Sequence, residues 1–169
     1  MCGLRSAIAR LLPCLAVFLA SVGCQYDPYA DRFVTHKPRP EDVVGRYRLK
    51  EQTINREGLQ ALRGKRSSIE LFADSRFIAS NIPPGSFGPI PDENFFSSLA
   101  SGSGTWRIDV VANVASGFAG TKTVWGVRLN SPGFEFDSAE LTGARPPYGL
   151  IFTVGDPDSG QVMIFEREQ

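Results

Sequence analysis

Apolar and polar residues alternate in short segments along most of this chain. In segment 43–49, Val43, Tyr47 and Leu49 face one way while Arg46 faces the other. A period of two residues is that of a β-strand with one buried face. The same kind of pattern predicts further strands at residues 67–72, 76–80, 104–110, 122–129, 134–141, 148–154 and 161–167.

Turn-forming residues separate these segments. Ala73-Asp74-Ser75 predicts a tight hairpin, and Asp156-Pro157-Asp158-Ser159-Gly160 predicts the turn between the last two strands. One helix is predicted at 55–62, where Asn55 suits the N-cap and Gly64 suits the end. About eight short strands with one short helix predict an all-β domain, either an antiparallel barrel or an antiparallel sandwich.

The last two predicted strands differ from the others because they are apolar on both faces. Residues 150–152 and 162–165 carry no charged side chain. An apolar outer face needs a cover, since exposed apolar surface is costly. We expect the cover to come from the predicted helix, through Leu59 and Leu62, or from the long Pro-rich loop 81–103.

The first residues form an export signal. Arg5 and Arg10 give a positive start, residues 11–20 are uncharged and apolar, and small residues precede Cys24. The uncharged stretch is shorter than the roughly 20 residues that a transmembrane helix needs. With a cysteine directly after the expected cut, residues 1–23 resemble the signal peptide of a bacterial lipoprotein.

Cysteine usage bears on the fate of Cys24. Cys2 and Cys14 leave with the signal, so Cys24 is the single thiol of the mature chain and has no partner for an internal disulfide. An ordinary signal peptidase cut after Gly23 gives the same start and leaves this thiol free. The resemblance implies instead a lipid on Cys24 and a place in the bacterial envelope, at the periplasmic face of the outer membrane.

The mature chain divides into a tether and a domain. Residues 24–40 mix aromatic, charged and proline residues without a period, and we expect them to be a tether that holds the domain off the membrane. Residues 41–169 are then a single domain. Without Arg5 and Arg10, the mature chain has 16 basic and 18 acidic residues, which gives no positive field for nucleic acid.

Residues suited to catalysis or metal binding are few. His36 is the only histidine and lies in the expected tether, so no histidine base is predicted within the domain. Asp156 and Asp158 begin like a calcium loop, but Gln161 and Arg167 stand where an EF-hand needs glycine and glutamate. We therefore expect no enzyme activity, no metal site and no cofactor.

A second resemblance concerns the fold. Gly45-Arg46-Tyr47 is similar to the Gly-X-Trp of lipocalin-like barrels, and Arg167 stands where those proteins place an arginine across the barrel end. A helix after the first strand, followed by hairpins, also resembles small bacterial lipocalin-like lipoproteins. The resemblance covers about residues 41–168 and implies a lipocalin-like barrel.

The alternation places four aromatic residues on inward faces. These residues are Tyr47, Trp106, Trp125 and Phe152. They are candidates for binding a small apolar ligand or lipid inside a barrel, although the same side chains can fill a small barrel completely. A binding module is therefore the first functional hypothesis.

The alternative hypothesis is an envelope protein that acts through protein partners. The loop 81–103 carries Phe87, Phe95, Phe96 and Leu99 among its prolines. Long loops of this kind often bind ligands or proteins. The loop is predicted to be either a partner-binding surface, a lid over the barrel mouth, or a cover for the sheet.

Overall fold

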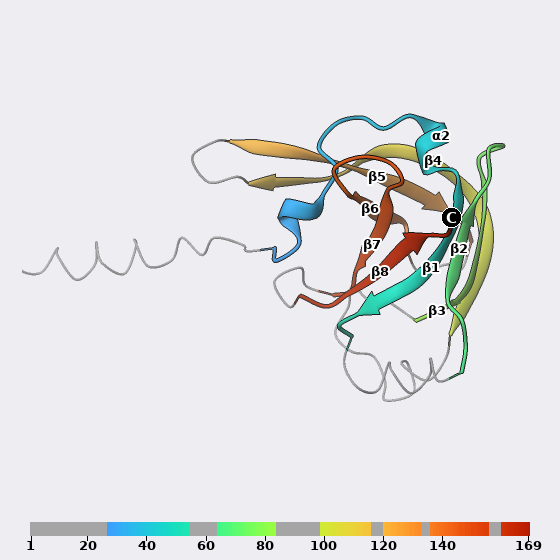
Figure 1. Ribbon diagram of the computed structural model, residues 1–169. Helices are drawn as coiled ribbons and strands as arrows, with labels where there is room; N and C mark the ends of the chain where they lie inside the picture. The colour runs from blue at the N-terminus through green and yellow to red at the C-terminus, as the bar shows by residue number, and fades with distance from the viewer. Residues whose placement is uncertain (1–26, 55–63, 84–98, 116–119, 133–135, 156–159) are drawn as a thin grey trace, which may run out of the picture.

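The chain folds into a closed antiparallel barrel. The computed structural model describes residues 27–54, 64–83, 99–115, 120–132, 136–155 and 160–169. Within these residues, eight strands follow one another around the barrel in sequence order, and β8 pairs with β1 to close it (Figure 1). The all-β prediction is confirmed, and of the two predicted architectures the barrel is the one observed.

The strand predictions agree with the structure along the whole barrel. The strands are β1 Gly45–Gln52, β2 Ser68–Leu71, β3 Arg76–Ile82, β4 Ala100–Ala115, β5 Thr121–Asn130, β6 Ser138–Thr142, β7 Gly149–Thr153 and β8 Val162–Arg167. The largest difference is β4, which is much longer than the predicted 104–110. A register shift between Val110 and Ala112 breaks its alternation. The alternating sequence pattern therefore stops at Val110, although the strand itself continues to Ala115.

Within the described residues, two short helices precede the barrel, and neither was predicted. They are the 3-10 helix η1 Ala30–Arg32 and the helix α2 Pro40–Val43. In α2, Pro40 occupies the first turn, where its missing N–H costs nothing, and Glu41 and Asp42 suit the positive helix end. Val43, expected to begin the first strand, instead ends α2. The predicted helix 55–62 lies outside the described residues.

Side chains from all eight strands fill the barrel. Phe152 lies between the rings of Phe136 and Phe165, with centroids 5.1 Å and 5.6 Å away. We call the buried interior residues the inner cluster; its largest members include Tyr47, Ile69, Leu71, Phe77, Ile82, Trp106, Leu129, Leu141, Leu150, Phe152, Met163 and Phe165. Their close contact accounts for most of the stability of the fold.

A second cluster lies outside the barrel, over β7 and β8. This outer cluster consists of Phe33, Val124, Ile151, Val162 and Ile164. Its partly buried neighbours are Tyr29, Ala30, Val111, Ala112 and Val114. The outer face of the last hairpin is therefore covered, as its apolar pattern requires. Among the described residues, the cover comes from the N-terminal segment and from β4. Leu59, Leu62 and most of loop 81–103 lie outside the described residues, so their part in the cover stays a prediction.

The N-terminal segment is attached to the barrel by backbone hydrogen bonds. Val34 N–H donates to Leu141 O at 2.9 Å, and Trp125 N–H donates to Val34 O at 2.8 Å. Phe33 forms a β-bridge with Thr142. Phe33 and Val34 are an apolar pair in an otherwise polar stretch, and both are buried. The folded part thus begins before residue 41, and much of the segment expected to be a tether belongs to it.

β4 and β5 continue past the barrel wall as a two-stranded arm. β3 pairs with β4 only as far as Thr105, and β6 pairs with β5 only from Gly126 onward. Beyond these points β4 and β5 pair mainly with each other, and they project to the left in Figure 1. We define the arm as residues 111–115 and 121–124.

Candidate functional site

The four predicted ligand residues do not occupy equivalent places. Tyr47, Phe152 and Trp106 belong to the inner cluster and are 0%, 1% and 6% exposed. Trp125 is only partly buried and packs against that cluster, with the Lys37 ammonium 5.6 Å from its ring centroid. Water can hardly touch Tyr47 or Phe152, so these two side chains contribute packing at their positions.

Tyr47 helps to close one end of the barrel. Its hydroxyl donates a hydrogen bond to Val43 O at 2.5 Å, which attaches α2 to β1. Burial raises the pKa of this phenol to about 12, while the positive charge of Arg167 acts in the opposite direction. The neutral hydroxyl is therefore a donor at any physiological pH.

Arg167 crosses the same barrel end. Its guanidinium donates to Asp42 O at 3.2 Å. Gly45 lies directly beneath it, with φ of 151°, and a β-carbon there would overlap the Arg167 side chain. The three residues that suggested a barrel-end motif, Gly45, Tyr47 and Arg167, thus meet in space and attach α2 as a cap.

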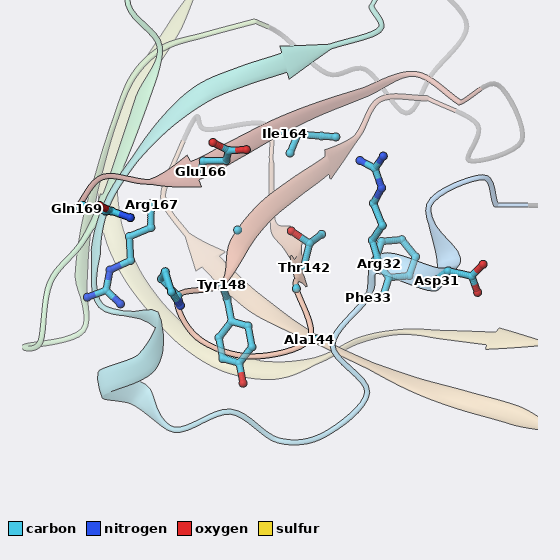
Figure 2. Close-up of a pocket in the computed structure, with 13 residues that line it drawn as sticks. Asp31, Arg32, Phe33, Thr142, Ala144, Tyr148, Ile164, Glu166, Arg167 and Gln169 are labelled. Atoms are coloured by element: carbon cyan, nitrogen blue, oxygen red, sulfur yellow. The ribbon is translucent and has the colours of Figure 1, made fainter.

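A hollow of about 640 Å³ opens on the outside of this barrel end (Figure 2). We call it the Tyr148 groove. It is formed by the N-terminal segment, the β6–β7 turn and the end of β8. Its lining residues are Asp31, Arg32, Phe33, Thr142, Gly143, Ala144, Pro147, Tyr148, Gly149, Ile164, Glu166, Arg167 and Gln169. The groove therefore depends on the attachment of the N-terminal segment.

The Tyr148 groove combines apolar and charged walls. Phe33 and Ile164, both buried in the outer cluster, contribute apolar surface. Arg32 and Glu166 stand on opposite sides of the groove in Figure 2 and are exposed. The Arg32 guanidinium also lies 5.3 Å from the Tyr29 ring centroid. Such a surface suits a molecule with an apolar part and a polar or charged part.

Tyr148 joins the β6–β7 turn to the N-terminal segment. Its hydroxyl lies 3.0 Å from His36 Nε2, within hydrogen-bond distance. Burial raises the pKa of this phenol, the Asp42 carboxylate adds to the effect and Arg39 opposes it. His36 is exposed, as a tether residue would be, but it is held against the fold by this contact.

The groove was missed in the sequence because its walls come from segments that are distant in the chain. Phe33 was assigned to a tether, and Ala144 and Pro147 lie in a turn without a recognisable motif. The one available signal was the apolar pair Phe33-Val34 within a polar segment. That pair indicated a docking contact, and the apolar outer face of β7 and β8 was the surface that needed one.

Several predicted features lie outside the described residues. Cys24, the loop residues Phe87, Phe95 and Phe96, and Asp156 and Asp158 are among them. The loop predicted at 81–103 is shorter than expected, because its ends belong to β3 and β4. Leu99 is described and is half-buried, immediately before β4 begins.

Two properties of the described residues bear on the nature of the site. In that part of the chain, no helix is long and apolar enough to cross a membrane. No group of three or more histidine, cysteine, aspartate or glutamate residues in the same ranges is placed to hold a metal ion. Comparison with family models, with curated proteins and with solved structures found no match.

Proposed function

We propose that this protein is an exported bacterial lipoprotein, anchored through a lipid on Cys24 at the periplasmic face of the outer membrane. The order of positive start, apolar core, small residues and cysteine supports the anchor. The absence of a second cysteine in the mature chain supports it as well, since a lipid gives the thiol a role. The barrel is a non-catalytic binding module of lipocalin-like type.

The ligand is a small apolar molecule or lipid, and the Tyr148 groove is its site. The groove carries this proposal because its volume of about 640 Å³ lies within the range of small-molecule sites. Phe33 and Ile164 receive the apolar part, and Arg32 and Glu166 face the polar part. The barrel interior is less suitable, because Tyr47 and Phe152 fill it with side chains that have almost no free surface.

The ligand proposal predicts a loss of binding when the groove is filled. Ala144 is exposed in the turn and lines the groove, so Ala144→Phe places a ring in the ligand volume. We expect at least about a tenfold lower affinity, with stability changed by less than about 0.5 kcal/mol. Native mass spectrometry of the mature protein, purified gently from its own host, detects the co-purifying mass. Titration of the identified molecule then gives the affinity.

The matched control for Ala144→Phe is Arg145→Phe. Arg145 is the next residue of the same turn and is also exposed, but it does not line the groove. It should retain the ligand. Equal binding by both variants, or a mature protein that carries no small molecule, would remove the groove from consideration.

The anchor proposal predicts that Cys24→Ser releases the protein. Without the thiol no thioether lipid forms, and each buried methylene of a lost acyl chain removes about 0.8 kcal/mol of membrane affinity. We expect the wild type in the membrane fraction, with the mass of its acyl chains, and the variant without acyl mass and no longer membrane-bound after processing. Cys14→Ser, within the signal, is the control and should behave like the wild type. Unchanged processing and membrane attachment in Cys24→Ser would refute the anchor.

A further inference from the structure

We propose that the β4–β5 arm is a second membrane contact, which lies on the lipid surface beside the anchor and holds the barrel directly against the bilayer. This inference rests on the proposed lipid at Cys24. It differs from the expectation that residues 24–40 keep the domain away from the membrane. Four features of the chain support it: the few residues between Cys24 and the described fold, the place where the N-terminal segment packs, the composition of the arm and the length of the arm.

The segment between Cys24 and the first described residue is very short. Only three peptide units separate Cys24 from Asp27, so their α-carbons are at most about 11 Å apart in any conformation. The polar headgroup layer on each side of a bilayer is itself about 5–7 Å thick. An acylated Cys24 therefore brings Asp27 to within a few ångströms of the headgroup surface.

From Asp27 onward the chain is held by hydrogen bonds and packing. Ala30 N–H donates to Asp27 O at 3.2 Å, and Tyr29 N–H donates to an Asp27 carboxylate oxygen at 2.8 Å. A few residues later, Phe33 is buried and Val34 is hydrogen-bonded between β5 and β6. The barrel must consequently follow the anchor closely.

The anchored segment and the arm pack against the same outer cluster. Tyr29 and Ala30 pack against the outer cluster together with Val111, Ala112 and Val114. In Figure 1, η1 lies beside the arm, and the arm projects away from the barrel on that side. The arm is therefore close to the anchored segment, as is Gly160, where a β-carbon would lie 3.5 Å from Pro28 Cγ.

The arm carries little charge: its exposed side chains include Asn113, Thr121 and Lys122, while Val111, Ala112, Val114 and Val124 pack on the outer cluster. From Val110 to Thr121 the sequence contains no ionisable side chain, and Lys122 is the only charge in the arm. A lysine at the membrane surface extends its ammonium toward the headgroups while its methylenes stay in apolar surroundings. The backbone groups between the two strands are paired, which lowers the cost of leaving water.

The charged side chains of the N-terminal segment lie near the base of the arm, where they can contact lipid headgroups and water. Asp27, Asp31, Arg32 and Lys37 belong to the anchored segment, and each except Asp27 is exposed. The arm extends about 16 Å past Val110, given a rise of about 3.3 Å per residue over residues 111–115. It can therefore rest in the interfacial layer while these charged groups remain hydrated.

The test uses the mature acylated protein in vesicles of phosphatidylethanolamine and phosphatidylglycerol. Asn113→Cys places a single reactive thiol on the exposed part of the arm, because Cys24 is occupied by lipid. The thiol carries an environment-sensitive fluorophore, and lipids with a spin-labelled headgroup or a shallow acyl position act as quenchers. Ile78→Cys is the matched control; Ile78 is 47% exposed on β3, which lies across the barrel from the arm in Figure 1.

We expect the lipid quenchers to reduce the Asn113 signal at least about threefold more than the Ile78 signal. Thr121→Asp, which adds a charge to the exposed arm, should reduce that difference. Intact mass spectrometry of the same samples reports acylation. An acylated protein with equal quenching at both sites overturns the arm contact and leaves the anchor standing. A protein without acyl mass overturns both. A fluorescence change at Asn113 that follows protein concentration, without lipid quenching, assigns the arm to a second copy and overturns the membrane contact.

Discussion

Truncating Phe152 to alanine is expected to lower the free energy of unfolding by about 3–5 kcal/mol. Phe152 is 1% exposed, and its ring packs edge-to-face against Phe136 and Phe165. The variant loses the transfer energy of a whole ring, leaves a cavity between two other rings, and loses the favourable aromatic contacts. Denaturant unfolding followed by tryptophan fluorescence measures the loss, with Trp106 of the inner cluster as an internal probe.

The control for Phe152→Ala is Ile78→Ala. Ile78 is 47% exposed on β3, so its truncation should change stability by less than about 0.5 kcal/mol. The pair also discriminates between a filled and a hollow barrel. A ligand-contacting Phe152 at the wall of an open cavity would lose little stability on truncation, because no packed neighbours would be abandoned. A small loss of stability in Phe152→Ala would therefore favour a ligand site inside the barrel.

The strands were predictable because each carries its own signal. The wall residues around Tyr47 on β1, and those around Trp106 on β4, alternate with a period of two. The turn at Ala73-Asp74-Ser75 was predictable for a similar reason, since Ser75 adopts a φ of 65° in a hairpin closed by Phe72 and Arg76. Such features depend on neighbours within a few residues of the chain.

Contacts between distant segments could not be derived in this way. Arg167 and Asp42 are 125 residues apart, and the hydrogen bond from the Arg167 guanidinium to Asp42 O can form only once the barrel has closed. The resemblance to a barrel-end motif indicated Arg167, but not the helix that it holds. The N-terminal segment was misjudged because Pro38 and Pro40 suggested a spacer, whereas two buried residues, Phe33 and Val34, are sufficient to attach it to the barrel.

The candidate site was the least predictable part. Aromatic residues on inward faces indicate a core and a cavity equally well, and only the extent of packing separates the two. The structure places Tyr47 and Phe152 in the packed core and leaves space outside, where Phe33 and Ile164 meet the turn around Ala144. Small hollows between segments have no periodic signal in a sequence.

Glu140 provides the second large effect, which is a dependence of stability on pH. It lies on the outer side of β6, opposite Gly126 of β5 and Ile151 of β7. Burial raises its pKa from 4.5 to about 7, and the negative charges of Asp27 and Asp137 add to the increase. The folded protein therefore keeps a proton on Glu140 that the unfolded chain has already lost at pH 6.

The sign of the effect follows from this difference. Below about pH 4.5 both states hold the proton, and Glu140 does not affect stability. As the pH rises toward 7, only the unfolded state releases it, so unfolding becomes easier and stability falls. Above pH 7 the loss is constant. A shift from 4.5 to about 7 corresponds to roughly 3 kcal/mol at most, and residual solvent access reduces it.

Replacing the carboxyl by an amide should remove this loss. We expect Glu140→Gln to be more stable than the wild type by about 2 kcal/mol at pH 8 and by nearly nothing at pH 4. Denaturant unfolding at several pH values between 4 and 8 gives both curves. Glu51→Gln is the control, because Glu51 is exposed on β1 and should leave the pH dependence unchanged. If Glu140→Gln and the wild type lose stability in parallel as the pH rises, Glu140 is ionised in the folded protein. The carboxylate would then reach solvent beneath the N-terminal segment, and the packing of Tyr29 and Phe33 over the outer cluster would be looser than the structure indicates.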